Sequence, residues 1–71
     1  MVTKTAMVAR VLARGRVCHG ANGLILRLGH TYLAYDCRHW RVWFYYRGIR
    51  KELKGRIVDK LNTMHSFGRK S

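Results

Sequence analysis

The chain has 71 residues, and its 15 Lys and Arg face only three Asp and Glu, which gives a formal net charge of +12 at pH 7. This length excludes more than one small domain, while a hydrophobic fraction of 48% excludes a disordered tail. We therefore expect a single small basic domain over residues 1–71, with residues 1–2 and 66–71 frayed at its ends.

Residues 3–14 are predicted to form the first helix. Thr3 or Thr5 can cap its start, and Gly15 is suited to end it. β-branched Val8 and Val11 also permit a strand in this segment. The apolar residues that share one helical face are Met7, Val8, Val11 and Leu12.

A series of strands and turns follows the first helix. Glycine and asparagine favour turns, whereas β-branched and aromatic residues favour strands. The predicted strands cover residues 16–19, 24–28, 31–35 and 40–47. The predicted turns cover residues 20–23, the glycine-first hairpin Gly29-His30, and residues 36–39.

The spacing of apolar residues changes after Gly48 and predicts a second helix over residues 49–64. Gly55 weakens this helix by about 1 kcal/mol relative to alanine. Its apolar stripe consists of Ile49, Leu53, Ile57, Leu61 and Met64. Its basic face consists of Arg50, Lys51, Lys54, Arg56 and Lys60.

The predicted fold class is therefore α+β: an N-terminal helix, a three- to four-stranded antiparallel β-meander and a C-terminal amphipathic helix. Both helices are expected to cover one face of the sheet and to leave the other partly open. The order resembles that of double-stranded-RNA-binding domains, which also begin their last helix with cations. The Gly-Pro-x-His loop and the Lys-Lys-x-x-Lys helix start of those domains have no counterpart here, where the segment reads Arg50-Lys51-Glu52-Leu53-Lys54.

Alternation along residues 40–47 predicts one candidate binding surface. Trp40, Val42, Phe44 and Tyr46 are expected to face the core. Arg41, Trp43, Tyr45 and Arg47 are expected to face the other way, with Arg27 beside them. Such a surface suits phosphates and unpaired bases, although the same aromatics would also suit core packing or a protein contact. The basic face of the second helix is the other candidate.

The charge points to a small regulatory protein that binds nucleic acid, either DNA or RNA, because arginine holds phosphate through two parallel hydrogen bonds. Ten of the 15 basic residues are arginine. The alternative is an adaptor of the kind that phages and mobile elements encode, which binds host transcription machinery such as RNA polymerase through protein contacts. An acidic protein complex would attract the same charge.

We expect no enzyme, no catalytic residue, no cofactor and no small-molecule substrate. The three carboxylates are scattered, and Cys37 near His39 lacks an orienting third group. A metal site is not expected either, because Cys18, His19, His30, Cys37 and His39 lack the usual ligand spacing.

The expected setting is the reduced cytoplasm. Two cysteines do not make a disulfide scaffold, and no long apolar run resembles a signal peptide. No stretch approaches the roughly 20 apolar residues of a membrane span. Binding to a membrane surface is not expected, because the first helix has a narrow apolar face without aromatics.

Overall fold

The computed structural model describes the backbone of residues 3–70 and the side chains of residues 3–67. Helix α1 (Lys4–Arg14) and helix α2 (Arg56–Lys70) flank five strands. The strands are β1 (Arg16–Gly20), β2 (Gly23–Leu28), β3 (Thr31–Asp36), β4 (Arg41–Tyr46) and β5 (Ile49–Leu53). They form one antiparallel sheet in the order β1-β2-β3-β4-β5. The predicted α+β class is confirmed, with five strands rather than three or four.

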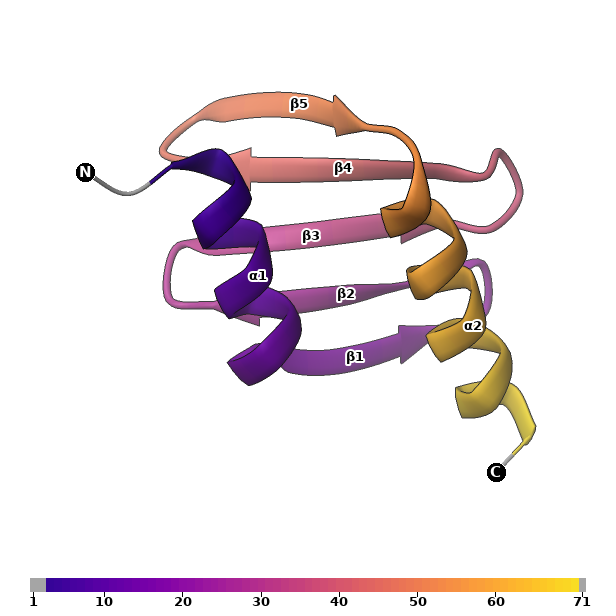
Figure 1. Cartoon of the computed structure of the whole chain (residues 1–71). Coiled ribbons are helices and arrows are strands. Elements are labelled where there is room, and N and C mark those ends of the chain that lie inside the picture. The colour runs from indigo at the N-terminus through magenta and orange to yellow at the C-terminus, as the bar shows by residue number, and fades with distance from the viewer. Residues whose placement is uncertain (1–2, 71) are drawn as a thin grey trace.

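Both helices lie on the same face of the sheet and run across its strands (Figure 1). Helix α1 crosses one end of the strands, and α2 crosses the other end. No helix covers the opposite face in the part of the chain that the structure describes. We call this opposite surface the open face.

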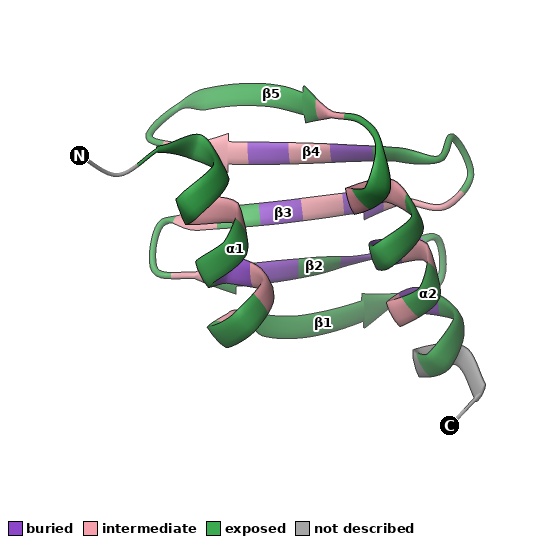
Figure 2. Cartoon of the chain, in the orientation of Figure 1, coloured by how far each residue is buried: buried purple, intermediate pink, exposed green. Residues whose placement is uncertain are grey.

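The core is a single layer between the two helices and the three central strands. Figure 2 shows buried residues on β2, β3 and β4, whereas β1 and β5 are almost entirely exposed. Inward side chains recur at every second strand position, as a pleated sheet requires. The buried apolar residues are Val11, Leu24, Leu26, Leu33, Tyr35, Val42, Phe44 and Leu61.

Helix α1 begins and ends where the sequence predicts. The Thr3 Oγ1 accepts a hydrogen bond from the Ala6 backbone N–H at 3.1 Å, which caps the helix. The Gly15 N–H donates to the Val11 carbonyl at 2.8 Å, after which the chain becomes extended. A Cβ at Gly15 would lie 2.4 Å from that carbonyl oxygen, so only glycine fits at this helix end. The strand alternative for this segment is excluded.

The predicted helix over residues 49–64 was wrong in its first part, because residues 49–53 form β5. Ile49 and Leu53 are four residues apart, and this spacing puts two side chains on one side of a strand as well as of a helix. The chain is turned back onto β4 by Arg47 (φ 48°) and Gly48 (φ 80°), since two consecutive positive φ values are typical of a type I′ hairpin. Gly55 (φ 96°) then separates β5 from α2.

The end of α2 and the resemblance to double-stranded-RNA-binding domains also need correction. Helix α2 continues through residues 66–70, which we expected to be a frayed tail. Residues 1–2 and residue 71, whose fraying was also predicted, lie outside the described residues. The resemblance does not hold, because two extra strands are present and the cations at residues 50, 51 and 54 precede the last helix instead of beginning it.

The predicted strand over residues 40–47 is shorter at both ends in the structure. Trp40 lies in the β3–β4 loop with φ 54° and is 56% exposed, so its predicted place in the core was wrong. Arg47 lies in the β4–β5 turn. Val42 and Phe44 are buried, as predicted, and Tyr46 is half-buried on the same side.

Two glycines at the β1–β2 hairpin allow a matched test of the sheet geometry. A Cβ at Gly23 would lie 1.8 Å from the backbone oxygen of Tyr35, whereas a Cβ at Gly20 would meet its nearest atom at 3.6 Å. We expect Gly23→Ala to lower the free energy of unfolding by at least about 2 kcal/mol, and Gly20→Ala to change it by about 0.5 kcal/mol or less. Urea unfolding measures both, and equal losses would contradict this geometry.

The buried Tyr35 hydroxyl provides a pH test of the core. It donates a hydrogen bond to the Asn62 Oδ1 at 2.7 Å, and burial raises the pKa of Tyr35 above its usual 10.0. The neutral phenol therefore contributes stability below pH 10 that is lost as the pH rises through the raised pKa.

We expect Tyr35→Phe to cost about 1 kcal/mol at neutral pH, where the hydrogen bond is intact. The difference between the two proteins should shrink above pH 10. Urea unfolding of both proteins from pH 7 to 11 tests this, and a difference that stays constant over the whole range would contradict it.

Candidate functional site

The open face carries side chains from all five strands. Antiparallel register fixes its membership, because residues paired across neighbouring strands point to the same side. The large side chains are mostly charged or aromatic. The set is Arg16, Cys18, Ile25, Arg27, Tyr32, Ala34, Asp36, Arg41, Trp43, Tyr45, Arg50 and Glu52.

One line of residues crosses the whole open face. Arg16 pairs with Arg27, and Arg27 pairs with Tyr32. Tyr32 pairs with Tyr45, which pairs with Arg50. We call this line the arginine–tyrosine row. With neighbouring strands about 4.8 Å apart, it spans about 19 Å, with aromatic rings in its middle and a guanidinium group at each end.

The aromatic rings of the open face are held by their neighbours. The Tyr32 and Tyr45 rings are stacked, with centroids 4.5 Å apart and planes inclined by 14°. The guanidinium carbon of Arg50 lies 4.6 Å from the centroid of the Trp43 ring, as in a cation–π contact. Each of these three rings therefore already has a partner on one face. A base that stacks on Trp43 has to use the other face or displace Arg50.

Five of the predicted site residues come together on the open face. They are Arg27, Arg41, Trp43, Tyr45 and Arg50. Arg50 was predicted on the second helix, but its place on β5 brings it beside Trp43. The strand surface proposed from sequence is thus present, with Arg50 in addition and without Arg47.

The other five predicted residues are dispersed. Arg47 occupies the β4–β5 turn, where its guanidinium carbon lies 5.5 Å from the Tyr46 ring. Lys51 pairs with Phe44 and so points to the helix side of β5. Lys54 lies between β5 and α2, and only Arg56 and Lys60 lie on α2. The continuous basic helix face that we predicted does not exist.

Sequence reasoning missed two members of the arginine–tyrosine row. Alternation through residues 31–35 could have placed Tyr32 opposite to Leu33 and hence on the open face. The predicted turn at residues 20–23 could have set Arg16 against Arg27. Both signals were available, but they require the hairpins to be extended into register pairs.

The described lysine and arginine side chains lack acidic partners within the protein. Among residues 3–67, one contact joins a basic to an acidic side chain, from His39 Nδ1 to Asp36 Oδ2 at 2.7 Å, and it is an ion pair only when the imidazole is protonated. No Lys or Arg side chain in that range pairs with a carboxylate. The positive charge of the open face is therefore available to an external anion.

A hollow of about 480 Å³ opens beside the arginine–tyrosine row, between the β1–β2 turn and the β3–β4 loop. Three of its lining positions, Gly20, Gly23 and Ala34, carry little or no side chain. The Cys37 N–H donates to the Asn22 carbonyl at 2.9 Å and thereby ties the loop to the turn. We call it the glycine hollow. Its lining includes Gly20, Gly23, Ala34, Ile25, Trp43, Asp36, Arg38 and His39.

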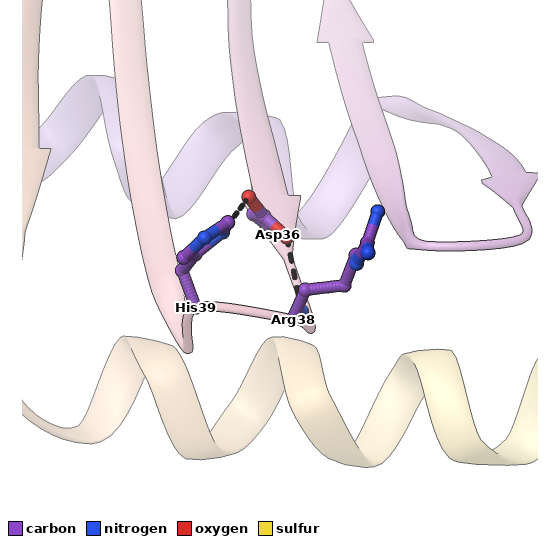
Figure 3. A network of polar contacts seen from close by, with 3 residues as sticks. All are labelled: Asp36, Arg38 and His39. Carbon is purple, nitrogen blue, oxygen red and sulfur yellow. Dashed lines mark hydrogen bonds and ion pairs between the residues drawn. The ribbon is translucent and has the colours of Figure 1, made fainter.

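Asp36 is the carboxylate at the rim of the glycine hollow. Its Oδ1 accepts the Arg38 backbone N–H at 3.0 Å, and its Oδ2 lies 2.7 Å from His39 Nδ1 (Figure 3). The Arg38 side chain extends away from this carboxylate. The hydrogen bond from His39 lowers the pKa of Asp36 below its usual 3.8, with a smaller contribution from the Arg38 N–H. Asp36 is therefore an anion at neutral pH.

Residues 3–67 contain no group of three or more His, Cys, Asp and Glu side chains that could hold a metal ion. Cys18 is exposed and Cys37 is half-buried, and both are free thiols. The residues considered for zinc thus do not converge in the described part of the chain.

The comparisons with known proteins add no relative. The chain matches no protein-family model, no curated protein and no solved structure. Neither helix, as far as the structure describes it, is long and apolar enough to cross a membrane.

The contact between Asp36 and His39 can be tested by titration. We expect the Asp36 carboxyl to titrate below 3.8 in the wild-type protein, because the hydrogen bond from His39 favours the ionised form. In His39→Ala the pKa should rise toward 3.8. Carbon-detected NMR of the side-chain carboxyl measures both values, and an unchanged pKa in the variant would show that the contact is not formed in solution.

Proposed function

We propose that this protein binds single-stranded nucleic acid, RNA or DNA, across its open face. The observation that carries the proposal is the arginine–tyrosine row. It places stacked aromatic rings between guanidinium groups on a surface that no helix covers within the described residues.

The row offers the two kinds of contact that a single strand needs. Guanidinium groups hold phosphate oxygens through paired hydrogen bonds. Exposed aromatic rings stack on unpaired bases, which contributes about 1–3 kcal/mol per base and tolerates any sequence. Trp43 adds a third ring beside the stacked tyrosines, and the Arg50 guanidinium over it can turn toward a phosphate.

Single strands fit this surface better than a duplex does. The major groove of B-DNA is about 12 Å wide and admits one helix or a two-stranded ribbon. The arginine–tyrosine row spans about 19 Å across five strands and cannot enter that groove. The cations predicted for a duplex-binding helix are divided among β5, the following link and α2, which also disfavours duplex binding.

The overall charge supports the proposal at longer range. Basic residues outside the open face, such as Arg10 and Lys60, are exposed and raise the potential around the molecule. Most of the affinity is expected to come from neutralised phosphates, so binding should weaken steeply with salt. We place it among small regulatory proteins of the cytoplasm, where its two free thiols would stay reduced.

Two charge-matched triple variants test the surface. The first, Arg16→Gln with Arg27→Gln and Arg41→Gln, removes cations from the open face. The second, Arg10→Gln with Arg56→Gln and Lys60→Gln, removes cations from the helices. Both variants remove three positive charges, so long-range attraction falls equally in each.

We expect the open-face variant to bind a single-stranded oligonucleotide less tightly, and its slope of log K against log salt to decrease by about 2. The helix variant should retain the wild-type slope. Fluorescence anisotropy at several salt concentrations measures both. Equal losses in the two variants would mean that binding follows net charge and not the open face.

A parallel experiment tests the protein-adaptor alternative. The protein is used to capture partners from a lysate before and after nuclease treatment. Under our proposal, the captured proteins disappear once the nucleic acid is digested. Stoichiometric retention of one acidic complex after digestion, together with binding of oligonucleotides that ignores salt, would favour the adaptor and contradict the proposed function.

A further inference from the structure

The glycine hollow is an open concavity with room for one planar ring system. Its volume of about 480 Å³ lies within the roughly 300–1,000 Å³ of small-molecule pockets. The hollow opens on the same face as the arginine–tyrosine row and shares Trp43 and Ile25 with that face. A single strand lying along the row therefore passes the mouth of the hollow.

The hollow combines a flat apolar wall with one fixed anion. Trp43 contributes an aromatic ring to the lining, beside the small side chain of its cross-strand partner Ala34. The Asp36 side chain is 40% exposed, and its position is fixed by its two hydrogen bonds. A carboxylate has about four acceptor sites, so two remain after those bonds, one on each oxygen.

We propose that the glycine hollow binds one unpaired guanine of the single strand, with its Watson–Crick edge on Asp36 and its ring against Trp43. This inference rests on the proposed function. Guanine presents two neighbouring N–H donors, at N1 and N2, which match the two oxygens of a carboxylate. Because adenine, cytosine and uracil each set acceptor atoms beside their donors, they would meet the carboxylate with repulsion.

The position of Asp36 supports a base contact over a phosphate contact. A carboxylate repels phosphate, and the protein has only three acidic residues, one of which stands at the mouth of this hollow. Arg38 also lines the hollow, and its guanidinium would have to turn toward Asp36 to donate to the guanine O6. The free acceptor sites of Asp36 thus match the N1–H and N2–H donors of guanine.

Five-nucleotide RNAs with four uridines and one variable central base test the inference. We expect central guanine to bind about tenfold more tightly than adenine, cytosine or uracil, within the discrimination that one bidentate contact gives. In Asp36→Asn this preference should be lost, because an amide accepts at only one of its two positions. Anisotropy at one salt concentration measures all the ratios.

Two further variants test whether misfolding of Asp36→Asn explains a loss of the guanine preference. Ala34→Leu fills the hollow and leaves the carboxylate intact, so it should also abolish the preference. Arg16 belongs to the row but does not line the hollow, so Arg16→Gln should weaken the binding of all four RNAs while the guanine preference is retained.

The result that overturns the inference differs from the result that overturns the proposed function. Equal, salt-dependent binding of all four RNAs, or a guanine preference that survives Asp36→Asn, would overturn the guanine site and leave single-strand binding in place. Absence of salt-dependent binding to every RNA, and to the matching DNA oligonucleotides, would overturn both.

Discussion

In the described residues 3–70, helices cover one of the two faces of the sheet, and strand register therefore determines which side chains are buried and which are exposed. A shift of one residue in β2 would bury Arg27 and expose Leu26, because successive side chains alternate between faces. Tight turns hold the register. Gly29 (φ 64°) supplies one of these turns, and Arg47 with Gly48 supplies another. The same strand register therefore determines both the arginine–tyrosine row and the buried core.

The protein combines this thin core with an unusually high positive charge. A net charge of +12 lies on 71 residues, and no described Lys or Arg side chain pairs with a carboxylate. Repulsion of this kind weakens a compact state, whereas an anion that binds only the folded chain stabilises it by mass action. Binding and stability are therefore linked in this protein. Under the proposed function, the side chains that would bind phosphate are also those whose mutual repulsion weakens the free fold.

Local sequence signals were sufficient to predict the elements whose apolar spacing fits only a helix or only a strand. Helix α1 with its Thr3 cap, the hairpin at Gly29 and the alternation of Val42 with Phe44 all follow from residues close in the chain. Strand β5 could not be predicted, because the spacing of Ile49 and Leu53 fits a helix as well as a strand. Its edge position also leaves Lys51 in solvent, so no buried side chain marks the strand. Only part of the candidate site could be predicted, since cross-strand neighbours such as Tyr32 follow from the strand register and not from the local sequence. The contact between Asp36 and His39 and the glycine hollow depend on loop geometry that no pattern encodes.

The meander order has a consequence for how the site fluctuates. Each strand pairs only with the strands next to it in the chain, so contacts form with little loop-closure entropy and the sheet can assemble hairpin by hairpin. The edge strands β1 and β5 have one neighbour each and bury almost nothing. They are the parts that open most easily. The two outer guanidinium groups, Arg16 and Arg50, therefore sit on the elements that open and close most often, around a tyrosine pair held on the most persistent part of the sheet.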